Sequence, residues 1–148
     1  MLIRSQTISR ELARIGVDRA VETAVELGCR VCIAIMDTSG QLVSYDRMDG
    51  APFQSAQHAQ DKAYSSAGNH TATHEFWDMI KGDPWLVSGV AKIQGLSWLG
   101  GGRPVLLGGE LIGSVGVSGS CGMPQDQAIS EAAIQAMLEA IAGVPPEL

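Results

Sequence analysis

The chain has 148 residues, of which 45% are hydrophobic and 18% are charged, and its formal net charge is −6. This length is typical of one domain, and the apolar content excludes a disordered chain because it is enough to build a core. The acidic balance, without a cluster of Lys and Arg, argues against a nucleic-acid partner. We therefore expect a single domain over residues 1–148.

No segment is apolar enough for a membrane span or for the core of a signal peptide, so we expect a cytoplasmic protein without a membrane partner. Three cysteines, an odd number, fit a reducing compartment. Cys29 and Cys32 have the spacing of a CxxC motif. They lie at a buried strand, however, where positions three apart point to opposite faces, and we expect both to be structural thiols.

The first half of the chain predicts a helix, a hairpin and a second helix. Apolar residues recur at helical spacing over residues 5–27, and Gly28 follows as a stop signal. Residues 30–37 and 41–48 are rich in β-forming residues and are joined by a short turn with glycine, which predicts an antiparallel hairpin. Residues 54–68 are helical in composition. Their alanine stripe predicts close packing on a sheet, and its members are Ala56, Ala59, Ala63 and Ala67.

The second half begins with a short helix over residues 74–82, for which Thr73 is the expected N-cap. Residues 85–98 are ambiguous between a loop and a strand around GLSWL. Residues 103–107 and 110–118 predict a second hairpin, with Gly108 and Gly109 as a two-residue turn that needs positive φ. Pro124 opens a last helix, which ends near Gly143.

Eight of the eighteen glycines fall within residues 99–120. They do not form a phosphate site, because neither GxGxxG order after a strand nor GK[ST] occurs. Along residues 110–118, one face carries only Ile112, Ser114, Gly116 and Ser118. This nearly bare face allows a helix or a flat ligand to approach the backbone closely.

This order of elements predicts an α+β fold with a mostly antiparallel sheet. The sequence resembles the GlcG/HbpS family, also described as DUF336, as the heme-degrading domain and as the C-terminal domain of PduO corrinoid adenosyltransferases. The resemblance is carried by IMDTSGQLVSYDRMDGAP (35–52), AQDKAYSSA (59–67), GGGRPVLLGGELIGSVGVSG (100–119) and QDQAISEAA (125–133). It implies a profilin-like, five-stranded antiparallel sheet flanked by helices, and a homo-oligomer. Some relatives bind heme or corrinoid, and no axial heme ligand can be matched here.

Two pairs of residues are candidates for ligand binding. His58 and Lys62 lie one helical turn apart, opposite the alanine stripe, and face either water or a neighbouring subunit. Lys62 could anchor a carboxylate, with His58 as an iron ligand or proton carrier, or both could belong to a solvated helix face. Arg47 could grip a carboxylate beside Asp49, or the two could form an ordinary structural pair.

The remaining candidates lie near the ends of the predicted helices and strands. His70 and His74 have the spacing of two zinc ligands, but no third ligand is evident, so we expect no metal and assign His74 to a pocket or interface. Ser118, Gly119 and Asp126 could form or orient an anion-binding rim.

Two further features are open. Cys121 could be an activated thiol at a helix N-terminus. The three Trp and two Phe side chains could line a flat apolar cavity, or they could pack in the core.

Three hypotheses follow. The first is a homo-oligomer that binds heme or another tetrapyrrole through Arg47, Lys62 and a histidine. The second is a metal-independent, hydrolase-like enzyme acting on a small carboxylate from an aromatic, glycolate or diol pathway. In it, Arg47 and Lys62 bind the acid, and Asp49 or His58 moves protons. The third is a structural or regulatory subunit without a ligand.

Overall fold

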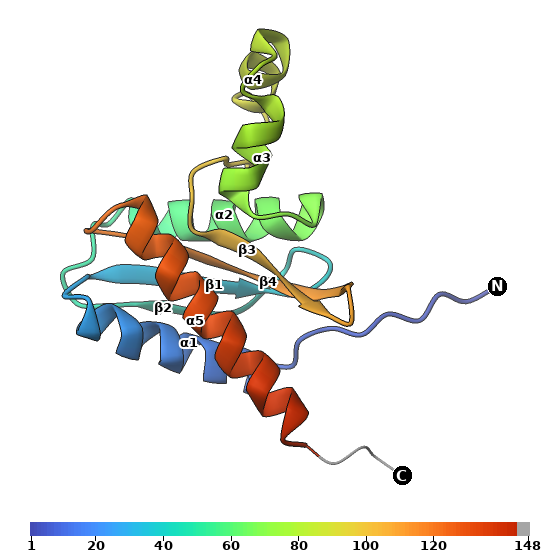
Figure 1. Ribbon diagram of the computed structural model, residues 1–148, viewed down its shortest axis with the longest axis vertical. Helices are drawn as coiled ribbons and strands as arrows, with labels where there is room; N and C mark the ends of the chain where they lie inside the picture. The colour runs from blue at the N-terminus through green and yellow to red at the C-terminus, as the bar shows by residue number, and fades with distance from the viewer. Residues whose placement is uncertain (145–148) are drawn as a thin grey trace.

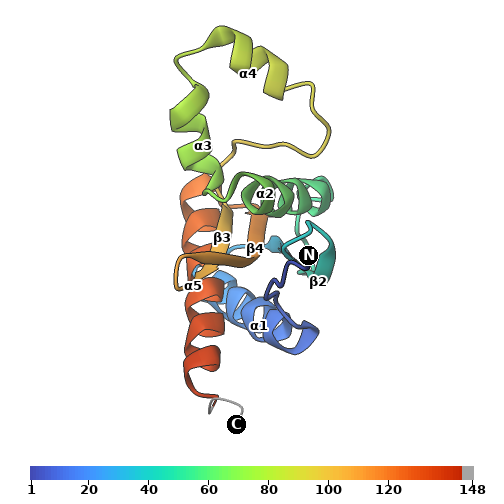
Figure 2. The same ribbon diagram turned by 90° about the vertical axis from the view of Figure 1, so that its right-hand side faces the viewer.

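A computed structural model of the chain describes residues 1–144. Three layers make up the body of the molecule, with the sheet between helices on both of its faces (Figures 1 and 2). The helices are α1 (Arg10–Glu26), α2 (Ser55–Asn69), α3 (Thr73–Ile80), α4 (Pro84–Val90) and α5 (Met123–Ala142). The strands are β1 (Val31–Met36), β2 (Leu42–Arg47), β3 (Gly102–Leu107) and β4 (Glu110–Gly119).

The sheet is antiparallel with strand order β2-β1-β4-β3, which confirms the α+β class and both hairpins. Gly108 and Gly109 have φ values of 60° and 86°, as their turn requires. The expectation of five strands is wrong, since residues 1–144 form four. Residues 84–90 are helical because the Asp83 carboxylate caps the Trp85 and Leu86 amides and Pro84 opens the helix.

The nearly bare face of β4 is the surface on which α2 packs. A Cβ at Gly116 would collide with the Ala59 carbonyl oxygen and would lie 2.5 Å from the Ala63 backbone nitrogen. Ser114 continues this close contact by donating a hydrogen bond of 2.7 Å to the Ala63 carbonyl. The alanine stripe therefore fits the small residues of β4, as the sequence indicates.

The opposite face of the sheet carries the larger core, beneath α1 and α5. Alanine and valine residues of α1 meet the aliphatic side chains of β1 and β4 and the buried stripe of α5. The fully buried members are Ala13, Val17, Ala20, Ala24, Ile33, Ile35, Val115, Val117, Ile129, Ala133 and Met137. This burial explains the helical periodicity of the first and last helices.

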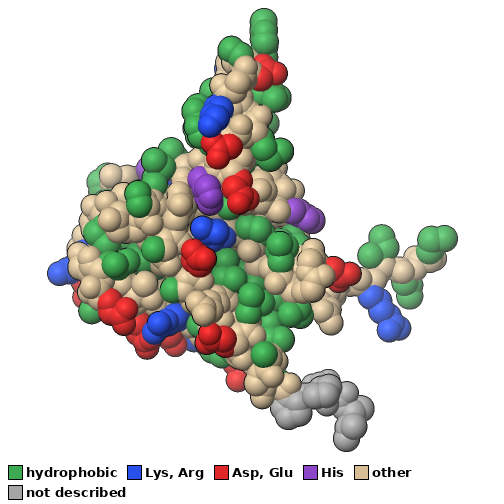
Figure 3. Space-filling view, in the orientation of Figure 1, with side chains coloured by type: hydrophobic (Ala, Val, Ile, Leu, Met, Phe, Trp, Pro, Cys, Tyr) green, Lys and Arg blue, Asp and Glu red, His purple; other side chains and the backbone are tan. Residues whose placement is uncertain are grey.

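Residues 73–101 form an arm that projects from the α2 side of the body. Helices α3 and α4 lead outward, and a long loop returns to β3 (Figure 2). The arm exposes much apolar surface, as Figure 3 shows along its length. The most exposed of its large side chains are Met79, Trp85, Leu86 and Ile93. Within residues 1–144, no helix has the length and apolar content to cross a membrane.

The cysteines differ from the expectation. Cys29 and Cys121 form a disulfide across a sequence separation of 92 residues, so Cys29 is not a free thiol and Cys121 is not an activated one here. Cys32 is buried and free, as expected. An odd number of cysteines argued against disulfides, but two of the three cysteines form one bond and the third stays free. Cys29 and Cys121 can bond because β1 and β4, whose ends they adjoin, lie side by side.

Candidate functional site

A pocket of about 280 Å³ lies between α2 and the arm. Helix α2 contributes His58 and Asp61, and the arm contributes Trp98. The other lining residues are small or apolar and come from the arm: Ala91, Leu96, Ser97 and Leu99. This pocket, which we call the His58 pocket, combines an imidazole, a carboxylate and an indole ring with leucine side chains.

Hydrogen bonds from α2 hold the return loop beside the pocket. Ser65 Oγ donates to the Gly95 carbonyl at 3.1 Å and accepts from the Ser97 amide at 2.7 Å. Thr73 closes the neck of the arm, because its hydroxyl donates to the Leu99 carbonyl at 2.6 Å and accepts from the Gly102 amide at 3.0 Å. The walls of the pocket are therefore fixed at both ends of the loop.

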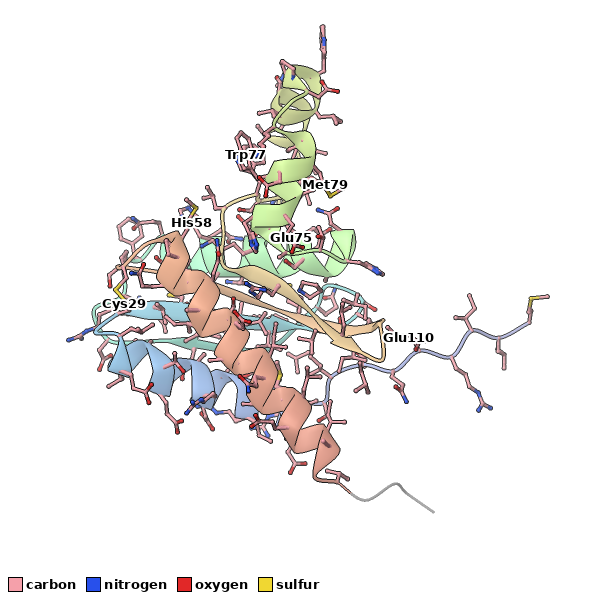
Figure 4. All side chains as sticks on the ribbon, viewed as in Figure 1. Cys29, His58, Glu75, Trp77, Met79 and Glu110 are labelled. Atoms are coloured by element: carbon pink, nitrogen blue, oxygen red, sulfur yellow. A yellow bond between two sulfur atoms is a disulfide. The ribbon has the colours of Figure 1, made fainter. Side chains whose placement is uncertain are left out.

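The aromatic side chains divide between the pocket and the surface. Trp77 on α3 stacks against Trp98, with ring centroids 6.2 Å apart and planes 26° apart. Figure 4 shows Trp77 and His58 on the same side of the arm's base. Trp85 and Phe53 are more than 80% exposed, so neither packs in the core. Of the aromatic side chains expected to line a cavity, Trp98 lines the His58 pocket and Trp77 packs against Trp98.

Lys62 does not face water or a neighbouring subunit, because it is 2% exposed. The side chain turns toward the sheet, where Nζ donates to the Val117 carbonyl at 2.8 Å and to Asp126 Oδ2 at 3.1 Å. Gly101 covers the pair, since a Cβ there would lie 3.0 Å from Lys62 Nζ. The outward orientation expected for Lys62 is wrong, and the absence of a side chain at Gly101 makes room for the buried ammonium group.

Burial acts on both ionisable groups of this pair. It lowers the pKa of Lys62 from its ordinary 10.5, opposed by the charge of Asp126. It raises the pKa of Asp126 from its ordinary 3.8, opposed by Lys62 and by the nearby Gly119 backbone. Asp126 Oδ1 makes no hydrogen bond of ordinary geometry with residues 1–144. The pair is thus a costly internal contact that joins α2, β4 and α5.

Arg47 and Asp49 line a second pocket of about 540 Å³, at the end of β2 beside the C-terminus of α1. Arg30 also lines it and is oriented by a 2.7 Å hydrogen bond from Nη1 to the Asp49 carbonyl. Neither arginine makes an ion pair within residues 1–144. His58 lies in the other pocket, so the two candidate proton carriers, Asp49 and His58, are separated.

Ser118, Gly119 and Asp126 do not form an exposed rim. Ser118 is 6% exposed and pairs with Cys32 in the sheet, and Gly119 pairs with Val31. The adjoining amides of Ser120 and Arg30 are already hydrogen-bonded to the Arg30 carbonyl and to Ser120 Oγ. The expected position of Ser118 is therefore wrong, because β4 extends through it.

The two remaining histidines lie near the start of the arm. His70 is the C-cap of α2 with a positive φ of 54°, while His74 lies in the first turn of α3. Ala72, not Thr73, is the N-cap of α3. The buried Nδ1 of His74 has no hydrogen-bond partner in the described part of the chain. Within residues 1–144, no three His, Cys, Asp or Glu side chains converge as a metal site.

Sequence reasoning missed Asp61, Arg30 and the pairing of Lys62 with Asp126. Asp61 follows His58 by one turn, so the i,i+3 spacing is a signal that was present in the sequence. Arg30 and Arg47 come together only because β1 pairs with β2. The partners Lys62 and Asp126 are 64 residues apart, and no local pattern joins them.

The sequence and the fold of this chain are both similar to those of known proteins. An uncharacterised 15.0 kDa protein from the dhaT-dhaS intergenic region of Citrobacter freundii is 33% identical over 123 residues, covering 82% of this chain and 86% of that protein. A double mutant of Streptomyces reticuli HbpS is similar with a TM-score of 0.83 and 29% identity, covering 97% of this chain and 92% of that one. The crystal structure of a PduOC–heme complex has a TM-score of 0.81 and 32% identity, covering 88% of this chain and 94% of that one.

A family model described as "Haem degrading protein HbpS-like" matches residues 8–135, which includes the whole sheet and most of α5. The match spans both the buried ion pair and the His58 pocket. The resemblance noted in the sequence is therefore confirmed, and this chain belongs to the HbpS-like family.

Proposed function

We propose that this chain binds a tetrapyrrole, with heme as the first candidate, in the His58 pocket. The observation that carries the proposal is the convergence of His58, Trp98 and two leucines in one pocket between α2 and the arm. Imidazole nitrogen is a common ligand of heme iron, and aromatic and aliphatic side chains pack against porphyrin rings. The relative crystallised as a heme complex supports the choice of ligand.

The residues of the pocket fit one side of such a ligand. Its volume of about 280 Å³ lies just below the ~300–1,000 Å³ found for sites that enclose drug-sized ligands, so it would enclose only part of a tetrapyrrole. His58 would be the residue that binds the iron, and Trp98 would pack against the ring. When bound, heme supplies an iron atom that can take up a small ligand or an electron.

The rest of the ring would be covered by a second copy of the chain. Met79 and Trp85 of the arm are 72% and 88% exposed, and the remaining exposed apolar residues continue along α4 and the return loop. Apolar surfaces of this kind mark interaction sites more often than single exposed residues do. We propose a homo-oligomer in which the arm forms part of the interface, as the sequence resemblance implies.

The test is a hemin titration of the purified chain followed by absorption spectroscopy. We expect a saturable shift of the Soret band that weakens by tenfold or more in affinity in His58→Ala, a loss of about 1.4 kcal/mol. His70→Ala is the matched control, because His70 caps the far end of the same helix. His74→Ala tests the earlier expectation that His74 lines the site. Saturable binding that survives His58→Ala would contradict this site.

A second candidate function is supported by the pocket of Arg30 and Arg47. Two arginines that form no ion pair within residues 1–144 can bind a small carboxylate in bidentate geometry, and Asp49 lies in the same pocket as a candidate proton carrier. Arg47→Gln should then abolish the NMR shifts caused by glycolate or benzoate. His58→Ala should leave those shifts unchanged, which separates the two proposals.

If neither hemin nor a small carboxylate binds, the third hypothesis, a structural or regulatory subunit, would be favoured. The cytoplasmic location stays a prediction. Disulfides such as Cys29–Cys121 are more common in oxidising compartments, so the location needs a direct measurement by fractionation.

A further inference from the structure

The Cys29–Cys121 disulfide joins two chain junctions at one end of the sheet, where Figure 4 shows the Cys29 sulfur. Cys29 links α1 to β1, and Cys121 links β4 to α5. The same junctions are also joined by hydrogen bonds, because the Arg30 amide donates to Ser120 Oγ at 3.0 Å and the Ser120 amide donates to the Arg30 carbonyl at 3.0 Å. The two segments would therefore remain side by side without the S–S bond.

The two sulfur-bearing residues differ in accessibility. Cys29 is 1% exposed, whereas Cys121 lies in an exposed run with Ser120, Gly122 and Met123. A thiolate from solvent therefore meets Cys121 more readily than Cys29, which is buried but borders the pocket of Arg30 and Arg47. Cys121 also directly precedes the cap of the twenty-residue helix α5, whose N-terminus has no side-chain cap and would stabilise the Cys121 thiolate that the second exchange step releases.

The pocket of about 540 Å³ that Cys29 lines suits a thiol that carries carboxylates. It presents the guanidinium groups of Arg30 and Arg47, neither of which is ion-paired within residues 1–144. Of its two carboxylates, Asp46 already faces Arg14 at 3.5 Å. Small peptide thiols have both the reactive sulfur and the carboxylates that such a pocket binds.

We propose that Cys29–Cys121 is a reversible thiol-exchange site for an acidic low-molecular-weight thiol, with Cys121 as the residue that forms the mixed disulfide. The thiolate bonds to Cys121 Sγ, the S–S bond breaks, and Cys29 leaves as a thiolate that takes a proton from water. A second thiolate attacks the added sulfur and releases Cys121. Two thiols are thereby oxidised to one disulfide, and the protein disulfide gains two electrons.

The reduced state would differ mainly at the start of α5. Cys29 would stay buried, where the Leu27 carbonyl lies 3.6 Å from its Sγ. The segment at Gly122 would lose its covalent tie, while the β1–β4 ladder would remain. This inference concerns a pocket that shares no lining residue with the His58 pocket, and it does not depend on tetrapyrrole binding.

The experiment exposes the native, oxidised chain to graded glutathione, quenches with acid, and maps adducts by mass spectrometry. We expect the Cys29–Cys121 bond to break as a glutathione adduct forms on Cys121, then release of the adduct to give the dithiol, and full recovery of the disulfide on re-oxidation. Cys32→Ala is the matched control, because Cys32 is buried and free and should not alter the reaction. An adduct on Cys29, or a disulfide that reacts only in denaturant, would overturn the proposal.

A second measurement tests the pocket and does not require a cysteine variant to fold. Arg47→Gln should slow the reaction with glutathione at least threefold but leave the reaction with neutral 2-mercaptoethanol unchanged. Equal slowing with both thiols, or with neither, would show that the pocket does not select acidic thiols. Hydrogen exchange should also rise at residues 122–126 on reduction, and unchanged exchange there would remove the structural consequence.

Discussion

Lys62 Nζ lies 3.1 Å from Asp126 Oδ2, and the two side chains are 3% and 4% exposed. Lys62 also donates to the Val117 carbonyl, so one ammonium group joins α2 to β4 and to α5. A buried ion pair contributes little net stability, but removing one partner leaves an uncompensated charge. The pair therefore makes the position of α5 depend on that of α2.

Lys62→Met should lower the free energy of unfolding by about 3–5 kcal/mol, because it leaves the Asp126 carboxylate buried and unpaired. Urea denaturation followed by circular dichroism measures the loss. The double variant Lys62→Met/Asp126→Leu should recover most of it. Lys81→Met is a control, since Lys81 forms an exposed pair with Asp78 and should change stability by less than about 0.5 kcal/mol. Additive losses in the double variant would contradict the coupling.

The pH dependence of stability should reflect both shifted groups. Burial raises the pKa of Asp126, so its contribution is fully present below pH 3.8 and is lost as pH rises through the folded-state pKa. Burial lowers the pKa of Lys62, so its contribution is present above pH 10.5 and is lost as pH falls through the folded-state pKa. The stability of the natural chain relative to the double variant should therefore be lowest at intermediate pH. A difference that does not vary with pH would refute this.

Gly116→Ala should destabilise the protein by about 1–3 kcal/mol, because the added Cβ collides with the Ala59 carbonyl and forces α2 away from β4. Thermal unfolding measures the change. Gly68→Ala is the matched control within α2, where an added Cβ meets nothing within 4 Å. That variant should be neutral or more stable by about 0.5–1 kcal/mol, since alanine favours helix. Equal effects would show that α2 does not pack as described.

Thr73→Val should loosen the arm, because it removes the hydroxyl that joins Leu99 and Gly102 to the start of α3. Buried polar groups left without a partner cost about 1–3 kcal/mol. We expect faster proteolysis within residues 85–98. Thr71→Val serves as the control, since the Thr71 hydroxyl donates to Glu75 at the surface, and the cleavage rate of this variant should match that of the natural chain.

Much of the fold could be predicted because its signals are local. The Gly108-Gly109 turn needs positive φ, and Gly116 allows the alanine stripe of α2 to approach, so the second hairpin and its packing followed from residue types. Residues 85–98, which the sequence left open between a loop and a strand, divide into most of helix α4, which Asp83 and Pro84 start, and a loop through Trp98. In the His58 pocket, only His58 and Trp98 were candidates from sequence. They come together because the return loop of the arm, whose structure the sequence left open, is hydrogen-bonded to α2 through Ser65.

The sequence by itself determined the α+β class, the two hairpins, the helices that cover the sheet and the membership of the HbpS-like family. Only the tertiary structure decided that Lys62 is buried against Asp126, that Arg30 joins Arg47, and that Cys29 bonds to Cys121. The physical reason is the sequence separation over which each interaction acts. Periodicity and turn chemistry act over a few residues, whereas charge pairing and disulfide formation depend on which strands and helices lie side by side.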